Sequence, residues 1–276
     1  MFRVPVFLFL LSFLGIPAPL FGQENTLPNQ LSLEMGLGHI ARQDKIFSPF
    51  IHRDVSFSQF QLRYSREKRW FQQLDLGYAG FSPMLNSPYS FTIAGETEQA
   101  YPHSFTFIHL DYKIGKRVWS NSKAGFTTGL LYATQLQLLN YAYGRIGSFG
   151  YYSTFGLGVF GRYTYQLTSK SELRTSLQLP VLLWLSRSPY LVNDDVFIEN
   201  ISSHASLRTM ADFIADGKLT TVFRNQELSF SQQYVYHFSE RWEIGAVYTF
   251  NFMHSPLPRR LLSYQNNLGV IINCRF

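Results

Sequence analysis

Residues 268–276, LGVIINCRF, decide how this chain folds. Leu268, Val270, Ile272, Cys274 and Phe276 are apolar at every second position, and three of the four residues between them are small or polar. A period of two is typical of a strand with one apolar face and one wet face. The sequence stops at Phe276, so its last side chain falls on the apolar face of this predicted strand.

The same alternation recurs along the whole chain. It predicts strands at residues 31–37, 60–64, 74–78, 108–114, 126–132, 155–163, 173–185, 228–238 and 244–252. With the terminal stretch this makes about ten strands, each near the roughly 9–11 residues that cross a bilayer at a slant. We therefore predict an all-β fold, a single transmembrane antiparallel β-barrel of about ten strands.

The connections between the predicted strands alternate in length. Short polar turns are expected at residues 66–69, 116–122, 168–171 and 239–241, and longer exposed loops at 43–53, 82–102, 139–149, 187–218 and 255–260. Short turns at one end and long loops at the other are typical of outer-membrane barrels. A soluble β-sandwich also alternates along its strands, but it requires neither this loop pattern nor a terminal phenylalanine.

These features resemble bacterial outer-membrane β-barrel proteins as an architecture, without matching one family. The resemblance implies that the terminal aromatic lies at the periplasmic interface. It also implies that Leu268, Val270, Ile272 and Phe276 form part of the signal read by the barrel-assembly machinery. The other partners it implies are outer-membrane lipid and lipopolysaccharide, together with an unknown small molecule or envelope protein.

The composition suits a barrel in a membrane. Charged residues make up 15% of the chain and aromatic residues 17%, so the sequence has few charges to hydrate and many rings for interface girdles. Trp70, Trp119 and Trp242 fall at or beside the predicted short turns. The formal charge of +6 is modest and its basic residues are scattered, so a nucleic-acid partner is not expected.

Residues 1–22 are predicted to be a cleaved signal peptide, followed by one barrel domain over residues 23–276. Arg3 precedes an apolar run over residues 4–14, Pro17 and Pro19 interrupt it, and Gly22 offers a small residue for cleavage. The alternative is an N-terminal membrane anchor, but the prolines interrupt a span that needs about 20 apolar residues. Export in this way predicts the outer membrane of a Gram-negative cell.

Charged and polar side chains of both signs are expected on the inner face of the barrel. The candidates are Glu34, Arg63, Asp75, His109, Asp111, Lys113, Arg162, Arg174, Glu227 and Glu243. A barrel of about ten strands has a lumen little wider than its side chains, and buried charges must pair or stay wet. One interpretation is a salt-bridged, hydrated plug, and the other is a narrow polar pore.

Catalysis is a weaker hypothesis. His109 and Asp111 share one strand face, with Asp75 expected one strand away, and such groups activate water in some surface hydrolases. No serine, histidine and orienting residue can be assigned in register, no metal-ligand spacing occurs, and no cofactor is expected. We therefore expect a narrow channel, a ligand-binding barrel or an accessory to an envelope complex, with a protease- or lipase-like surface hydrolase as the alternative.

The long loop at 187–218 is expected to contain a short helix. Leu207, Met210, Phe213 and Ile214 recur at helical spacing, and Gly217 follows as a terminating residue. We expect this segment either to form a lid on the barrel mouth or to present a surface for a ligand or partner.

Overall fold

The computed structural model describes residues 27–85, 87–93, 95–143, 146–188 and 206–276. The predicted signal peptide, residues 1–22, lies outside this part of the chain. In the described residues, no α-helix combines the length and the apolar character needed to cross a membrane.

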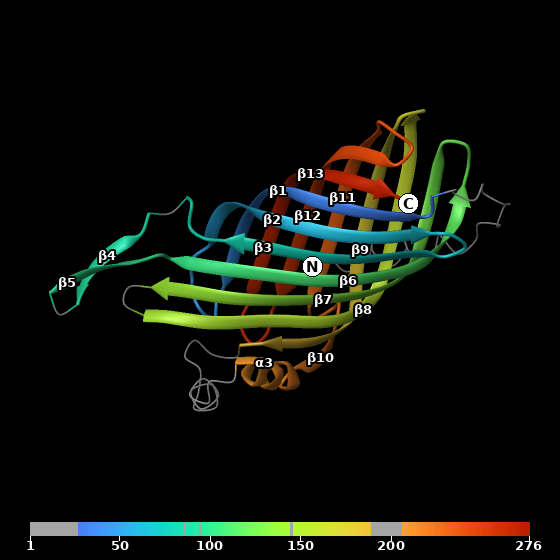
Figure 1. Cartoon of the computed structure of the whole chain (residues 1–276). Coiled ribbons are helices and arrows are strands. Elements are labelled where there is room, and N and C mark those ends of the chain that lie inside the picture. The colour runs from blue at the N-terminus through green and yellow to red at the C-terminus, as the bar shows by residue number, and fades with distance from the viewer. Residues whose placement is uncertain (1–26, 86, 94, 144–145, 189–205) are drawn as a thin grey trace, which may run out of the picture.

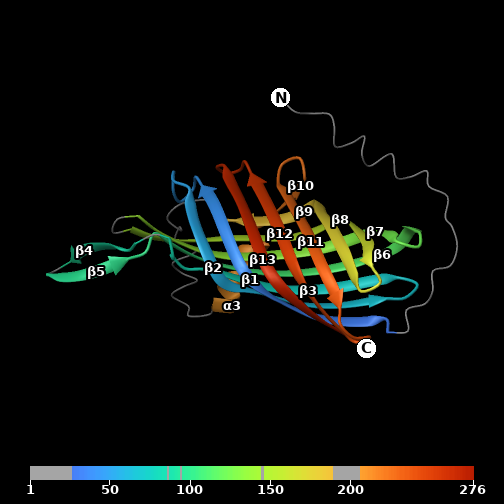
Figure 2. The same cartoon turned by 90° about the horizontal axis from the view of Figure 1, so that it is seen from above.

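The chain forms a closed antiparallel β-barrel of ten strands, as predicted (Figures 1 and 2). Its staves are β1 (Asn29–Asp44), β2 (His52–Glu67), β3 (Phe71–Phe81), β6 (His103–Ser120), β7 (Ala124–Tyr143), β8 (Ile146–Thr168), β9 (Ser171–Arg187), β11 (Gln226–His237), β12 (Trp242–Ser255) and β13 (Leu261–Arg275). Each strand pairs with its neighbour in this order, and β13 pairs with β1 to close the barrel. Closure leaves no open edge, which is what a spanning sheet requires.

The terminal strand has the faces that its sequence predicts. Leu268, Val270 and Ile272 are 61%, 53% and 45% exposed, whereas Ile271 and Asn273 are 1% and 0% exposed. The other strands add to the same outward apolar band. Its members include Leu31, Leu33, Met35, Leu37, Phe60, Leu62, Tyr64, Leu74, Leu76, Ile108, Leu110, Tyr112, Leu157, Leu177, Tyr234, Tyr236, Ile244 and Tyr248. This continuous apolar belt with a polar interior is the architecture of outer-membrane β-barrels.

One strand changes face along its length. The alternation of residues 173–185 predicts that Leu183 points outward, and this prediction is wrong because Leu183 is fully buried. A β-bulge falls where Gly158 pairs with Pro180 and Leu157 pairs with Leu182, which leaves Val181 without a partner on β8. The extra residue reverses the faces beyond it. Leu183 fills the space that Gly156 leaves open, since a Cβ there would lie 2.5 Å from Leu183 Cδ2.

Two predicted exposed loops are instead built into the barrel. β7 and β8 continue through residues 139–143 and 146–149, where a loop was expected, because Leu139 and Tyr141 point inward and are buried. The connection after β1 was also expected to be exposed, but Ile46 and Phe47 turn into the barrel mouth. Phe47 stacks on Tyr141 with ring centroids 5.0 Å apart. Apolar burial therefore overrides the turn-like composition of both segments.

Three strands of the described part of the chain lie outside the ring of staves. β4 (Tyr89–Ile93) and β5 (Glu96–Ala100) form a hairpin that projects away from the barrel (Figures 1 and 2). β10 (Lys218–Thr221) pairs with the end of β9. The hairpin belongs to the connection between β3 and β6, and β10 belongs to the one between β9 and β11, which runs past the predicted bound of residue 218.

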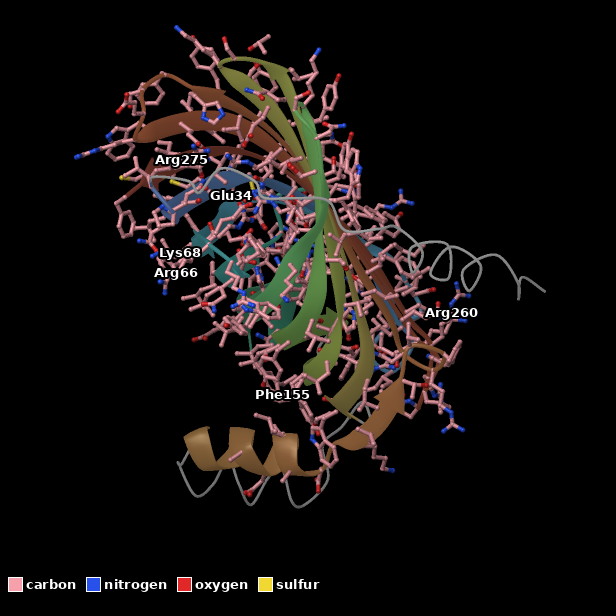
Figure 3. The ribbon with its side chains drawn as sticks, turned by 90° about the vertical axis from the view of Figure 1, so that its right-hand side faces the viewer. Glu34, Arg66, Lys68, Phe155, Arg260 and Arg275 are labelled. Atoms are coloured by element: carbon pink, nitrogen blue, oxygen red, sulfur yellow. The ribbon has the colours of Figure 1, made fainter. Side chains whose placement is uncertain are left out.

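The predicted helix exists as α3 (Ser206–Ala215), but it is not a lid on the mouth. Phe213 of α3 stacks on Tyr151 of β8 with ring centroids 4.1 Å apart. Trp184 Nε1 of β9 donates a hydrogen bond to the Ile214 carbonyl oxygen at 2.8 Å. Tyr151 points out of the barrel, since its neighbour Tyr152 points inward. The helix therefore packs on the outer wall, on the side where Phe155 lies in Figure 3.

The two ends of the barrel differ. The end that carries the connections after β2, β6, β8 and β11 is called the short-turn end, and the opposite one the long-loop end. Asn29 and Phe276 meet at the short-turn end through two backbone hydrogen bonds of 3.1 and 2.9 Å. In Figure 3, Arg66, Lys68 and Arg275 of this end lie well apart from Arg260 of the connection between β12 and β13.

Candidate functional site in the barrel lumen

All ten lumen candidates from the sequence lie on the inner face of the barrel. They divide into two groups along the barrel axis. Glu34, Arg63, Asp75, Lys113, Arg162, Arg174 and Glu243 belong to ionic networks toward the short-turn end, whereas His109, Asp111 and Glu227 line a chamber in the middle. The register between strands decides the group of each residue, because it sets which side chains on the two neighbouring strands lie beside each inward position.

Glu243 is the centre of the first ionic network. Its Oε2 lies 3.0 Å from Arg174 and 2.9 Å from the Asn273 amide nitrogen, and its Oε1 lies 2.9 Å from His237 and also contacts Arg275. These partners come from β9, β11 and β13, so one carboxylate ties three strands to β12. Glu243 is 1% exposed, and the donors around it compensate its charge.

Asp75 is the centre of the second network. Arg63 Nε and Lys113 Nζ lie 2.6 and 2.7 Å from its two carboxylate oxygens, and the Gln73 amide donates at 2.7 Å. Arg63 also lies 3.8 Å from Glu34. The networks of Glu243 and Asp75 together form what we call the short-turn plug, a layer of paired charges across the lumen.

Arg162 sits beside this plug and is less closely paired. Its nearest carboxylate oxygen belongs to Glu67, at 3.6 Å, and Glu67 also contacts Arg117. The Arg162 guanidinium lies over the Phe71 ring at 4.9 Å, which adds a cation–π contact.

A second plug, the long-loop plug, fills the opposite end and was not predicted. Arg42, fully buried, donates to the Tyr141 hydroxyl at 3.0 Å and to Gln137 at 2.9 Å. Asp44 lies 3.7 Å from Arg42 and 2.8 Å from Arg187. An apolar cluster surrounds this polar chain and includes Ile40, Ile46, Phe47, Phe81, Phe105, Leu139, Tyr152, Met253 and Leu261. The sequence did carry a signal for this plug. The alternation of β1 continues beyond Leu37, and its inward positions there include Arg42 and Asp44.

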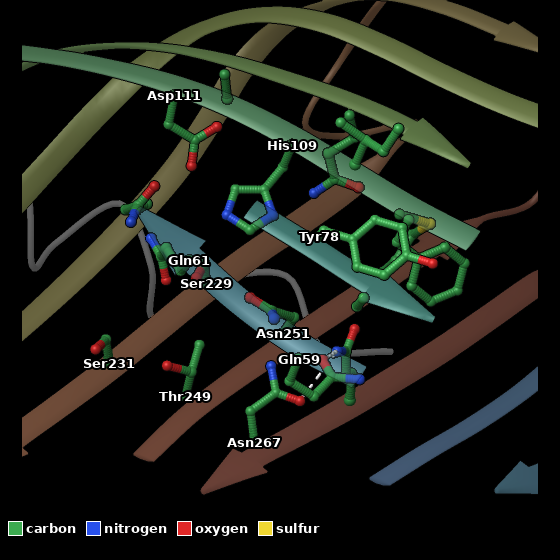
Figure 4. A pocket seen from close by; sticks show the side chains of 18 of the residues that line it. Gln59, Gln61, Tyr78, His109, Asp111, Ser229, Ser231, Thr249, Asn251 and Asn267 are labelled. Atoms are coloured by element: carbon green, nitrogen blue, oxygen red, sulfur yellow. Dashed lines mark hydrogen bonds between the residues drawn. The ribbon is translucent and has the colours of Figure 1, made fainter. Parts of the chain in front are cut away.

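Between the plugs lies a chamber of about 140 Å³. Amide and hydroxyl side chains make up much of its wall, as Figure 4 shows. They belong to Gln59, Gln61, Gln135, Gln137, Gln178, Gln265, Asn251, Asn267, Ser229, Ser231, Ser263 and Thr249. Such a wall offers many hydrogen-bond donors and acceptors to a small polar molecule.

His109 and Asp111 both line the chamber, but they do not form a catalytic pair. No histidine nitrogen lies within 4.0 Å of an Asp111 oxygen among the described residues. The His109 ring instead packs on Gly77, its direct partner on β3, where a Cβ would lie 1.9 Å from His109 Cε1. With its amide oriented to satisfy both neighbours, Gln178 donates to Asp111 at 3.3 Å and accepts from Lys113 at 2.9 Å.

Glu227 closes the chamber toward the long-loop plug. It is 3% exposed, and its carboxylate accepts from the Tyr152 hydroxyl at 2.7 Å, from Asn225 at 2.9 Å and from Thr154 at 3.4 Å. All three donors are neutral. The carboxylate is therefore hydrogen-bonded but not neutralised by a partner of opposite charge.

A histidine–carboxylate contact does occur at the long-loop end. His103 Nε2 lies 3.1 Å from Asp54 Oδ2, and both side chains are fully buried. Asp54 Oδ1 also accepts from the backbone nitrogens of Met84 and Leu85 at 2.9 and 3.2 Å, so the pair fixes the start of the connection after β3. Burial lowers the pKa of His103 although Asp54 opposes this, and burial beside His103 and Arg42 lowers the pKa of His52 to about 4.

Metal ligation finds no support in the described residues, which hold no group of three or more His, Cys, Asp or Glu side chains placed to bind an ion. The lumen thus combines two layers of ordered side chains with the polar chamber between them and a smaller pocket of about 40 Å³ beside Arg162 and Arg174. This arrangement suits the binding of a small polar molecule between the plugs.

No protein-family model matches the chain, and no curated protein matches it. The solved structures that it resembles include the outer-membrane protease OmpT from Escherichia coli, at 7% identity over 93% of this chain and 99% of that one, with a TM-score of 0.46. Neisserial surface protein A matches at 9% identity over 90% and 97%, with a TM-score of 0.34. The toluene transporter TodX of Pseudomonas putida matches at 12% identity over 90% of both chains, with a TM-score of 0.33.

Proposed function

We propose that this protein is an integral outer-membrane β-barrel that holds a small polar solute in its lumen. Its short-turn end faces the periplasm and its long-loop end faces outward. The observation that carries the proposal is the polar chamber of about 140 Å³ between two plugs of ordered side chains. A constitutively open pore needs a continuous wet path, whereas here buried networks cross the lumen on both sides of the chamber.

The membrane location is supported by the outer wall and by the turns. The outward apolar side chains form a belt whose exposure to water would be unfavourable. At the short-turn end, Trp70 and Trp242 are 44% and 45% exposed. Aromatic rings of this kind collect at membrane–water interfaces. Short turns face the periplasm in outer-membrane barrels, which supports the proposed orientation.

Single-channel recording tests the closed lumen. The wild-type protein in a planar bilayer should show no steady ion conductance. The double variant Arg42→Ala/Glu243→Ala removes one buried charge from each plug and should produce openings, while Glu240→Ala on an exposed turn should behave as wild type. A steady conductance of the wild-type protein would favour the narrow-pore interpretation and contradict this proposal.

Surface labelling tests the orientation. A peptide tag inserted beside Gly95, in the turn of the projecting hairpin, should be labelled on intact cells. The same tag beside Glu240 should be labelled only after the outer membrane is permeabilised. Labelling in the opposite order would mean that the barrel sits the other way round.

The hydrolase alternative has less support. His109 and Asp111 are not in contact, and the buried Asp54–His103 pair anchors backbone instead of facing a nucleophile. Assays with peptide and phospholipid substrates address it directly. Turnover that is lost in His109→Ala but kept in Glu240→Ala would revive the hydrolase.

A further inference from the structure

The chamber contains two carboxylates that no described cationic side chain contacts directly. Asp111 and Glu227 both line it, and within the described part of the chain neither has a Lys, Arg or His nitrogen within 4.0 Å. Because both carboxylates line the same chamber of about 140 Å³, their negative charges repel each other. Burying one carboxylate without a counter-charge is costly, and two in one cavity cost more.

Elsewhere in the lumen, acidic side chains lie close to basic ones. Glu34, Asp75 and Glu243 lie within 4.0 Å of at least one arginine or lysine, and Asp44 lies between Arg42 and Arg187. Of the acids that line the chamber, only Glu34 has such a partner among the residues that the structure describes. With Arg63 counted against Glu34, the wall has a surplus of two negative charges, from Asp111 and Glu227.

Two other chamber groups lack partners. Gln59 and Ser231 are 6% and 8% exposed, and both line the chamber. The Gln59 amide nitrogen and the Ser231 hydroxyl make no hydrogen bond to any described group. Buried polar groups are normally satisfied, so unpaired groups on a cavity wall point to a bound polar molecule.

We propose that the chamber binds a small organic cation, an ammonium compound that also carries a hydroxyl or similar polar group. The ammonium donates to Asp111 and Glu227, and the polar group bonds to the neutral amide and hydroxyl wall, at Gln59 or at Ser231. Figure 4 labels Asp111, Gln59 and Ser231 on this wall. This rests on the proposed solute-holding function and names the class of solute. An ammonium ion is favoured because it supplies both the missing positive charge and the missing hydrogen bonds.

Three two-carbon probes of nearly equal size test the charge requirement. Ethanolamine is a cation at neutral pH, ethylene glycol is its neutral analogue and glycolate is an anion. The full-length mature protein is folded into detergent micelles in the presence of each probe, so that passage through the plugs does not limit binding. Saturation-transfer NMR should detect ethanolamine bound at least tenfold more tightly than ethylene glycol, and should detect no glycolate.

Isosteric variants identify the carboxylates. Asp111→Asn and Glu227→Gln keep the shape of each group but remove its charge and replace one acceptor oxygen with an NH2 donor, and each should weaken ethanolamine binding by about tenfold or more. Glu240→Gln, on an exposed turn, should leave binding unchanged. Heat-modifiable migration on a denaturing gel, equal for all variants, shows that each one has folded into a barrel.

The outcomes separate the two claims. Ethylene glycol binding as tightly as ethanolamine, or unchanged ethanolamine affinity in both isosteric variants, would overturn the cation inference and leave the solute-holding chamber standing. No binding of any probe would overturn the cation inference, and steady wild-type conductance would independently overturn the proposed function.

Discussion

Arg63 and Asp75 stand directly opposite each other on β2 and β3, with Arg63 Nε 2.6 Å from Asp75 Oδ1. Lys113 on the next strand, β6, completes the group at 2.7 Å from the other oxygen. Three adjacent staves are therefore joined by one fully buried carboxylate. Because every salt bridge of Asp75 crosses a strand boundary, the group fixes the register of this wall as well as its charge balance.

Asp75→Asn should destabilise the barrel by about 3 kcal/mol, at the low end of the range for breaking a buried ion pair, because Glu34 still compensates part of the Arg63 charge. The measurement is urea unfolding in lipid vesicles. Glu240→Gln, at an exposed position on a short turn, should change stability by less than about 0.5 kcal/mol. Equal stability of the two variants would show that Asp75 is not an anchor of the wall.

Acid should weaken the long-loop end before the rest of the barrel. The pKa of His52 is lowered to about 4 in the folded protein, against 6.5 for a free histidine, so the unfolded chain binds more protons between these values. Stability contributed by neutral His52 is thus complete above pH 6.5 and decreases as the pH falls toward 4. Hydrogen exchange of the backbone amides near Tyr141, followed from pH 7 to 4, should show this loosening. His52→Gln should flatten the pH dependence, and an unchanged profile would contradict the assignment.

A glycine sets the position of His109. A Cβ on Gly77 would lie 1.9 Å from His109 Cε1, so Gly77→Ala must displace the ring or the strand. We expect a cost of about 1–3 kcal/mol, typical of overpacking. In a His109→Ala background the same change should cost much less, since the clash is gone. A double-mutant cycle by urea unfolding measures this coupling, and additive effects would mean that the two residues do not contact each other.

The strand pattern was predictable because one face of each stave meets lipid and the other meets the lumen. Leu268, Val270 and Ile272 show this without help from the structure. The same rule failed at Leu183, because a bulge beside Pro180 adds one residue and reverses the faces beyond it. The alternation alone does not show where that extra residue lies. Period-two reasoning therefore holds only as far as the next bulge.

The inward residues were predictable as a set but not as partners. The alternation places Asp75 and Asp111 on the same face, yet it does not say that Asp75 is doubly paired while Asp111 is left without a cation. That difference depends on register between strands, which the sequence sets only through packing. The long-loop plug escaped prediction for a related reason, because Ile46 and Phe47 lie in a segment that otherwise reads as a polar loop.

The lipid-facing register of β13 gives the sharpest test of the barrel. Val270 lies on the apolar band at 53% exposure, whereas Asn267, three residues earlier on the same strand, lines the polar chamber. An arginine near the bilayer midplane costs about 2–4 kcal/mol on the lipid face, so Val270→Arg should fold poorly into vesicles. Asn267→Arg should fold far better, because its guanidinium reaches the surplus negative charge of the chamber.

Asn273 is a less suitable control, since it is fully buried and donates to Glu243. Folding yield and urea stability of the two arginine variants decide the matter: if Asn267→Arg is the worse of the two, β13 is shifted by one residue, and the inward positions described above exchange places with the outward ones.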